Sequence, residues 1–147
     1  MPGQHALFEA AAAPAEAGRR RLRAPVCLGA GVVAAGALLT LRSPYDSGSY
    51  GFCPFLALTG YYCPGCGGLR AIHDLLHLDV AAAWDMNPLV VVAAPLVVIA
   101  WVFWVWRAWR GRAPSVPSTG VVVAMTVVLA VFTVLRNVPA LAGWLAP

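Results

Sequence analysis

The sequence has few charged residues and no lysine. Of its 147 residues, 11% are charged and 61% are hydrophobic, and all ten basic residues are arginine. A soluble domain carries about a quarter charged residues, so this composition excludes an ordinary soluble domain and indicates an integral membrane protein in contact with the lipid bilayer. The net charge of +4 is explained by membrane topology, and we do not expect nucleic acid as a partner.

Charge is scarcest in three apolar stretches, which we predict to be transmembrane helices at residues 25–41, 88–106 and 119–135. Helices of these lengths rise roughly 25–29 Å, just enough for a hydrocarbon core of about 30 Å. The first stretch also suits the apolar region of a signal peptide. No convincing small-residue cleavage site follows it, so we favour an uncleaved anchor.

The arginines are unevenly distributed around these spans. Seven of the ten lie before the first span or after the second, namely Arg19, Arg20, Arg21, Arg23, Arg107, Arg110 and Arg112. Loops rich in arginine remain in the cytoplasm, so the disordered tail 1–24 and the loop 107–118 are predicted to be cytoplasmic. The segment 42–87 and the tail 136–147 are then extracytoplasmic.

The segment 42–87 has a helical pattern of its own. Leu69, Ile72 and Leu76 recur at helical spacing, so we expect a helix from Gly67. Asp79 is predicted to cap a second short helix, and Asn87-Pro88 to begin the second span. The predicted fold is therefore an all-α integral membrane protein. It has three transmembrane helices, with an extracytoplasmic amphipathic or re-entrant helical segment between the first and second.

Three of the four cysteines lie in this segment, two of them in the stretch Cys63-Pro64-Gly65-Cys66. Proline followed by glycine predicts a type II turn with positive φ at Gly65. Such a turn brings the two thiols side by side. The glycines and the helix start that follow favour thiolate over thiol.

Three interpretations of the cysteines remain open. Cys53, Cys63 and Cys66 are suitable ligands for a metal such as zinc, with His73 or His77 as the fourth. Alternatively, two of the three form a disulfide and leave one thiol for exchange, or small residues simply pack closely at this turn. Cys27, within the first span, is interpreted as an ordinary small hydrophobic residue.

Arg70 follows the turn and completes the set of candidate catalytic residues, with Cys63 and Cys66. It can act as an anion clamp beside the thiols. It can equally pair with Asp74 one helical turn on, or extend to a lipid phosphate.

These residues resemble a family of small bacterial membrane proteins known as domain of unknown function 2752. The resemblance covers about residues 44–100 and rests on Cys53-Pro54-Phe55, Thr59-Gly60, Cys63-Pro64-Gly65-Cys66-Gly67, Arg70-Ala71 and Asn87-Pro88. The family usually has Thr or Ser where this chain has Leu69. The resemblance implies a location in the bacterial cytoplasmic membrane, and it implies no activity.

Two functions are compatible with these features. The first is a binding or scaffold protein whose cysteine motif, held by a disulfide or a metal, docks a membrane-protein partner. The alternative is an envelope thiol–disulfide oxidoreductase using Cys63 and Cys66. No thioredoxin-like βαβ pattern surrounds the pair, and no catalytic constellation is visible beyond it, so an enzymatic activity is left open.

Overall fold

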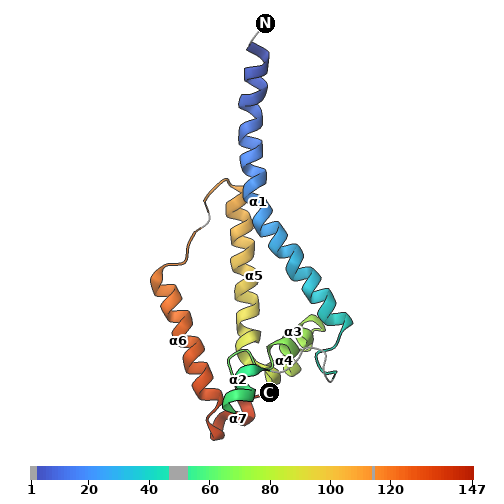
Figure 1. The fold of residues 1–147 in the computed structure, drawn as a ribbon, viewed down its shortest axis with the longest axis vertical. Helices are drawn as coiled ribbons and strands as arrows, with labels where there is room; N and C mark the ends of the chain where they lie inside the picture. The colour runs from blue at the N-terminus through green and yellow to red at the C-terminus, as the bar shows by residue number, and fades with distance from the viewer. Residues whose placement is uncertain (1–2, 47–52, 114) are drawn as a thin grey trace. The chain divides into compact units, whose positions relative to one another are not determined.

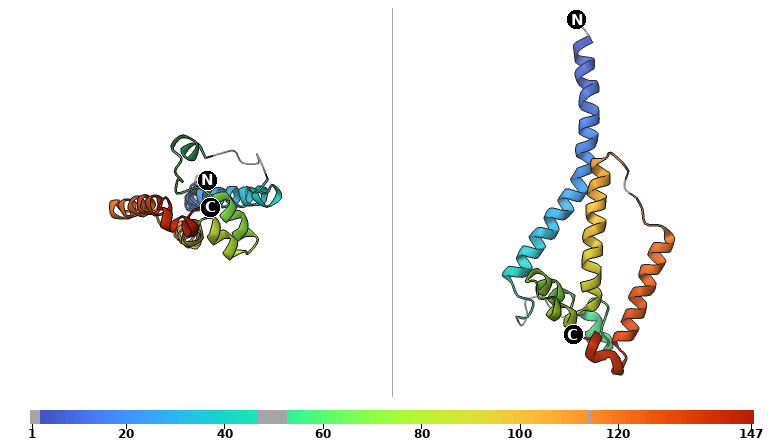
Figure 2. Two further views of the ribbon diagram at one scale, coloured as in Figure 1. Left: turned by 90° about the horizontal axis from the view of Figure 1, so that it is seen from below. Right: turned by 180° about the vertical axis from the view of Figure 1, so that it is seen from behind.

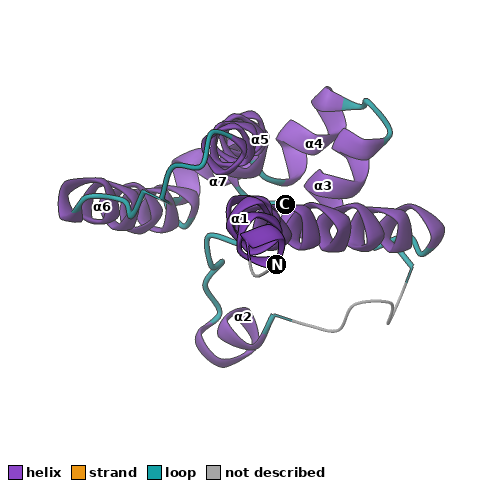
Figure 3. Cartoon of the chain, turned by 90° about the horizontal axis from the view of Figure 1, so that it is seen from above, coloured by secondary structure: helices purple, strands orange, loops and turns teal. Residues whose placement is uncertain are grey.

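The computed structural model describes residues 3–46, 53–113 and 115–147, and within them every regular element is an α-helix (Figures 1 and 3). The helices are α1 (Gly3–Leu41), α2 (Pro54–Thr59), α3 (Gly68–Leu76), α4 (Val80–Met86), α5 (Pro88–Trp109), α6 (Thr119–Arg136) and α7 (Pro139–Leu145). The predicted all-α class is confirmed. Positions 47–52 of the predicted segment 42–87, and position 114 of the predicted loop, lie outside the described residues.

Three helical stretches are long and apolar enough to cross a membrane, as the sequence predicted. They are Arg21–Leu41, Pro88–Trp109 and Thr119–Arg136, with mean hydropathies of 2.0, 2.5 and 2.1. Hardly any of their residues are buried inside the protein, so their apolar side chains are available to lipid tails. Length and composition thus indicate a multi-pass membrane protein.

The first helix begins well before its apolar stretch. Residues 3–24, which the sequence predicted to be a disordered tail, continue into the span as one helix. The reason is local, because this region is rich in alanine and alanine has the highest helix propensity. The second span also extends beyond its predicted end at residue 106, to Trp109.

The chain forms two compact units, and one of them comprises Met1–Val33 with Val97–Val116. Here the indole N–H of Trp101 donates to the carbonyl of Pro25 at 3.0 Å. A Cβ at Gly29 would lie 2.6 Å from Cζ2 of Trp101, so glycine permits this close approach between α1 and α5. Nearby, the guanidinium of Arg110 lies 5.3 Å from the ring centroid of Trp106, a cation–π contact.

The second unit comprises Ala34–Leu96 with Pro117–Pro147, and it contains the short helices. Helices α3 and α4 lie side by side (Figure 2). Ala71 and Ala83 are fully buried, and their small side chains allow the two helices to approach closely. Between the helices, Leu78 has a positive φ of 63°. Asp79 then begins α4, because its carboxylate accepts from the N–H of Ala82 at 2.9 Å. The predicted cap is confirmed.

Helices α5 and α6 also begin next to a residue whose side-chain oxygen accepts a hydrogen bond from a backbone N–H of the first helical turn. The side-chain oxygen of Asn87 accepts from the N–H of Val90 at 3.2 Å, and Pro88 is the first residue of α5, as predicted. Ser118 caps α6 in the same way through the N–H of Val121. After α6, the chain turns into α7, which packs against α6 and α4.

Candidate functional site

The turn that carries Cys63 and Cys66 closes with a hydrogen bond from the N–H of Cys66 to the carbonyl of Cys63 at 3.2 Å. Gly65 does not have a positive φ, so the prediction of a type II turn was wrong. The positive φ, 75°, occurs two residues later at Gly67, which caps the start of α3. The turn's carbonyls accept hydrogen bonds from Asn87 and Arg136, which are distant in the sequence, and we attribute the difference to these contacts.

Gly67 is required for two reasons. Its φ of 75° lies in the left-handed region, which residues with a Cβ rarely adopt. A Cβ at this position would also overlap the carbonyl oxygen of Met86, at the end of α4. The backbone of the cysteine turn therefore lies directly against the end of α4, and only glycine permits that contact.

The fold brings three sulfur atoms together. Cys53 caps the start of α2, and its Sγ lies 3.5 Å from Sγ of Cys63, which lies 3.4 Å from Sγ of Cys66. All three sulfurs lie within 4.8 Å of one another, a grouping that could hold a metal ion. We call these residues the sulfur cluster. The nine residues between Cys53 and Cys63 include α2 and the left-handed residue Gly60 at its end, and this short helix returns the chain to the turn.

Two fully buried side chains hold the turn in place. The guanidinium of Arg136 donates to the carbonyl of Cys63 at 2.9 Å and to that of Cys66 at 3.2 Å. The amide of Asn87 donates to the carbonyls of Pro64 and Cys66, both at 3.0 Å. Arg136 and Asn87 are both 0% exposed, and their donors pair with carbonyls of the turn inside the protein.

Asn137 adds a further support next to Arg136. Its side-chain oxygen accepts from the N–H of Tyr62 at 2.8 Å, and its amide donates to the carbonyl of Tyr62 at 2.9 Å. The sequence analysis missed Arg136 and Asn137 as part of the site. The available signal was the polar pair Arg136-Asn137 at the end of the third apolar stretch.

The pKa values of Cys53 and Cys66 are shifted in opposite directions. Burial, with a smaller contribution from the neighbouring thiols, raises the pKa of Cys66 to about 12. The pKa of Cys53 is lowered, chiefly by the backbone N–H of Leu56 at the start of α2. The sequence predicted that the start of the helix after the turn would favour a thiolate there. The structure instead shows this effect at Cys53, at the start of the preceding helix.

Arg70 is the third residue of α3. Its Nε donates to the carbonyl of Pro44 at 3.5 Å, and its guanidinium lies 5.2 Å from the ring centroid of Tyr45. Asp74, the partner considered for Arg70, accepts instead from the hydroxyl of Tyr45 at 2.6 Å. Burial and this hydrogen bond raise the pKa of Tyr45 to about 12, so the hydroxyl stays protonated and donates.

The two candidate histidine ligands contact other groups. Nδ1 of His73 lies 2.9 Å from the carbonyl of Leu39, at the end of α1. Nδ1 of His77 lies 2.8 Å from the carbonyl of His73, and the two imidazole rings are 4.3 Å apart. Among the described residues, the group that could hold a metal ion contains the three cysteines and neither histidine.

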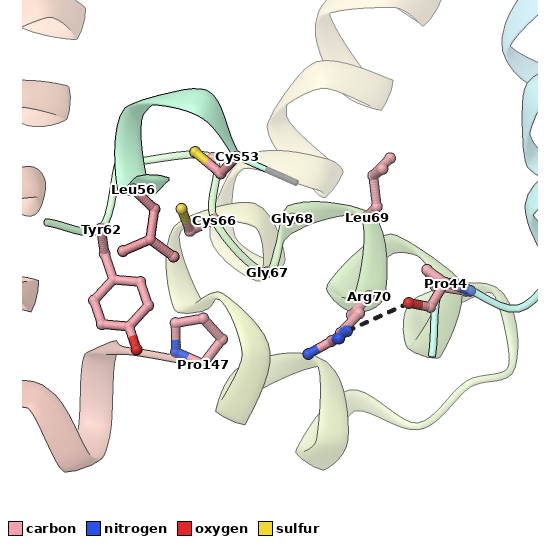
Figure 4. Close-up of a pocket in the computed structure, with 11 residues that line it drawn as sticks. Pro44, Cys53, Leu56, Tyr62, Cys66, Gly67, Gly68, Leu69, Arg70 and Pro147 are labelled. Atoms are coloured by element: carbon pink, nitrogen blue, oxygen red, sulfur yellow. Dashed lines mark hydrogen bonds between the residues drawn. The ribbon is translucent and has the colours of Figure 1, made fainter. Parts of the chain in front are cut away.

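A cavity of about 490 Å³ opens beside the cluster (Figure 4). Figure 4 shows Cys53 and Cys66 on one side of the drawn residues and the guanidinium of Arg70 on the other. The lining is formed by Pro44, Cys53, Leu56, Tyr62, Gly65, Cys66, Gly67, Gly68, Leu69, Arg70 and Pro147. The volume is in the range of sites for small molecules.

Comparison with known proteins confirms the resemblance. Residues 53–101 match a protein family described as "Protein of unknown function (DUF2752)". The match begins at Cys53 and includes the whole sulfur cluster, Arg70 and Asn87, and it ends before Arg136. No curated protein and no solved structure matches the chain.

Proposed function

We propose that this protein is a membrane-anchored metal-binding protein. In this proposal, Cys53, Cys63 and Cys66 hold a zinc-type divalent ion on the outer side of a bacterial cytoplasmic membrane. The observation that supports it most is that the three sulfur atoms lie within 4.8 Å of one another. Cysteine thiolates suit zinc and other soft metals, and a tetrahedral zinc site has Zn–S bonds of about 2.3 Å. Two sulfurs of such a site are about 3.8 Å apart, close to the separations of 3.4 and 3.5 Å in the cluster.

The metal would serve a scaffold role. The three ligands come from the start of α2 and from the turn before α3, so one ion would cross-link the α3 region to α2, a short helix with no buried residue. Structural zinc sites contribute folding free energy in this way. A cross-linked segment of short helices beside the spans is a rigid surface to which a membrane-protein partner can dock.

The arginine distribution supports the proposed orientation. Arg107, Arg110 and Arg112 follow the second span, and the four arginines at positions 19–23 precede the first. Their side is cytoplasmic by the positive-inside rule, which leaves the sulfur cluster outside. The short amphipathic helices α3 and α4 would then form a surface or re-entrant segment at the outer interface.

A second candidate function is thiol–disulfide exchange by Cys63 and Cys66. The supporting observation is the separation of 3.4 Å between their sulfur atoms, which requires only a small movement to reach bonding distance. In that reaction a disulfide of an envelope protein accepts two electrons and two protons and becomes a dithiol. Cys63 and Cys66 lose the same electrons and protons as their disulfide forms.

One labelling experiment distinguishes these functions. The protein is purified in detergent, its metal content is measured by mass spectrometry, and its thiols are alkylated in untreated, reduced and chelator-treated samples. We expect about one zinc per chain and labelling of the cluster only after chelation. Labelling that requires a reductant would support the exchange function instead, and immediate labelling without bound metal would leave only close packing.

Matched variants assign the metal to the cluster. Replacing any one of Cys53, Cys63 and Cys66 by serine is expected to abolish stoichiometric zinc. Cys27→Ser is the control, because Cys27 lies in α1 outside the cluster. Retention of zinc in all three cluster variants would refute the proposal.

A further inference from the structure

The last turn of α3 and the residue that ends it carry two histidines whose imidazole rings contact each other. His73 and His77 are one helical turn apart, so their side chains leave the helix on the same side. Their ring centroids lie 4.3 Å apart, with an angle of 41° between the ring planes. His73 is half-buried and His77 is exposed, so solvent reaches the pair through His77.

The hydrogen bonds of the pair determine which ring nitrogen carries the hydrogen. Nδ1 of His73 lies 2.9 Å from the carbonyl oxygen of Leu39, and Nδ1 of His77 lies 2.8 Å from that of His73. A carbonyl oxygen only accepts, so each Nδ1 donates and carries a hydrogen. Each Nε2 of the neutral imidazoles therefore has a free lone pair, and neither has a hydrogen-bond partner among the described residues.

Histidines that ligate metals have the same pattern of hydrogen bonds. A histidine that binds a metal through one ring nitrogen usually donates the N–H of the other to a carboxylate, a backbone carbonyl or water, which orients the ring. Both histidines of the pair already have such a carbonyl partner. With metal–nitrogen bonds of about 2.0–2.1 Å, the centroids of two imidazoles on one ion are about 5 Å apart. The observed 4.3 Å differs little from that separation.

The charge of the surrounding segment favours a cation. Between Arg70 and Arg107, the chain has three aspartates and no basic residue other than the two histidines. Asp74 accepts from the hydroxyl of Tyr45 and Asp79 from a backbone N–H, and in the described ranges neither forms an ion pair. An excess of negative charge raises the local concentration of cations at the surface.

We propose that His73 and His77 form a second metal site, which binds one divalent transition-metal ion of the nickel, copper and zinc group. Each Nε2 is a ligand, water fills the remaining positions, and both Nδ1–H bonds stay in place while the rings rotate toward the ion. Imidazole suits these metals, whereas calcium and magnesium prefer oxygen ligands. Because His73 donates to Leu39, the ion also strengthens the contact between α3 and the end of α1. This site is independent of the sulfur cluster, whose candidate ligands include neither histidine.

Nickel is a suitable probe, because it binds imidazole well while tetrahedral thiolate sites favour zinc. The detergent-purified protein, without an affinity tag, is saturated with Zn²⁺, dialysed to remove loosely bound zinc, and equilibrated with increasing Ni²⁺. Mass spectrometry measures the bound nickel and zinc per chain. We expect one bound Ni²⁺ per chain, no loss of zinc and no nickel–thiolate absorption.

Single substitutions assign the nickel to the pair. His73→Gln and His77→Gln should each lower nickel affinity by at least as much as loss of an outer-shell partner does, which is roughly 10- to 100-fold. His5→Gln is the matched control, because it removes the third histidine of the chain, near the start of α1, and should leave the affinity unchanged. His77 is exposed, so His77→Gln tests the site without disturbing a packed side chain.

Two results would overturn the inference. One is a wild-type protein that binds no nickel, and the other is a nickel affinity of His77→Gln equal to that of the wild type. The zinc content separates this inference from the proposed metal centre. Histidine-dependent nickel binding by a protein that keeps no zinc after dialysis would support the histidine site and refute the cysteine centre alone.

Discussion

At the scale of single residues, the two polar side chains that are fully buried among the described residues converge on one turn. Asn87 and Arg136 have no exposed surface, and both donate to carbonyls between Cys63 and Cys66. Leaving such groups unpaired costs about 1–3 kcal/mol each, and more for a charge. The position of the sulfur cluster therefore depends on side chains that are distant from it in the sequence.

Arg136→Gln should destabilise the protein strongly. The change leaves the carbonyls of Cys63 and Cys66 without their charged donor, so we expect a loss of about 3–5 kcal/mol in the free energy of unfolding. Unfolding in mixed detergent micelles, followed by tryptophan fluorescence, measures the change. Arg110→Gln is the control and should cost less than about 1 kcal/mol, because Arg110 is exposed over Trp106. Equal effects of the two substitutions would contradict the role assigned to Arg136.

A pair of glycines separates backbone strain from steric overlap. Gly60 and Gly67 have nearly equal φ values of 73° and 75°. A Cβ at Gly60 meets nothing within 4 Å, whereas one at Gly67 overlaps the carbonyl of Met86. Gly60→Ala should cost about 1 kcal/mol from the left-handed conformation alone, and Gly67→Ala at least about 3 kcal/mol.

The same unfolding measurement tests this difference. Gly67→Ala should also lower the zinc content of the purified protein, while Gly60→Ala should leave it close to one per chain. If the two variants lose similar stability, the contact between the turn and the end of α4 is not important for the fold.

At the scale of elements, the short helices depend on their ends. Helices α2, α3, α4 and α7 have six, nine, seven and seven residues, too short to be stable alone in water. Each therefore needs a defined start and a neighbour against which to pack. In α4 the start is the carboxylate of Asp79, and the packing is through the buried Ala83.

Asp79→Ala tests the start of α4. Loss of the hydrogen bond to the N–H of Ala82 should lower the free energy of unfolding by about 1 kcal/mol. Asp85→Ala removes the same charge near the end of the same helix. It should be neutral or slightly stabilising there, because a carboxylate near a helix C-terminus is unfavourable. Thermal unfolding of the two variants in one detergent is sufficient, and a more stable Asp79→Ala protein would exclude the cap.

At the scale of the whole molecule, the three candidate spans and the arginines around them are the basis of the proposed topology. An odd number of spans places the two ends on opposite sides. In the orientation that we propose, the positive-inside rule assigns the N-terminus to the cytoplasm and therefore the segment between the first two spans to the outside. This orientation decides whether the cysteines encounter an oxidising or a reducing environment.

Reporter fusions test the orientation. A reporter that is active only outside the cytoplasmic membrane should give signal when fused after Trp144 and none when fused after Arg112. A reporter that is active only in the cytoplasm should give the reverse pattern. If the first reporter is active only after Arg112, the sulfur cluster lies in the cytoplasm, and disulfide exchange with an envelope protein is excluded.

Features set by neighbouring residues could be predicted from the sequence. The three spans follow from hydropathy over about twenty residues, and the start of α4 at Asp79 follows from a side chain that bonds a backbone group three residues on. Cys63 and Cys66 were predicted to lie side by side at a type II turn; the turn type was wrong, but their sulfur atoms do lie 3.4 Å apart, with only two residues between them. In each of these cases, the partners are connected by a short piece of chain.

Tertiary structure alone decided the rest of the site. Arg136 bonds to Cys63 across 73 positions of sequence, and no local pattern indicates which buried carbonyls a distant arginine will satisfy. The same contacts explain the wrong prediction at Gly65, where the dipeptide Pro-Gly favoured a type II turn. Local preferences are worth about 1 kcal/mol, whereas an unpaired buried carbonyl or a steric overlap costs more. The turn therefore adopts the conformation in which Asn87 and Arg136 reach its carbonyls, and the positive φ moves to Gly67, where the chain passes Met86.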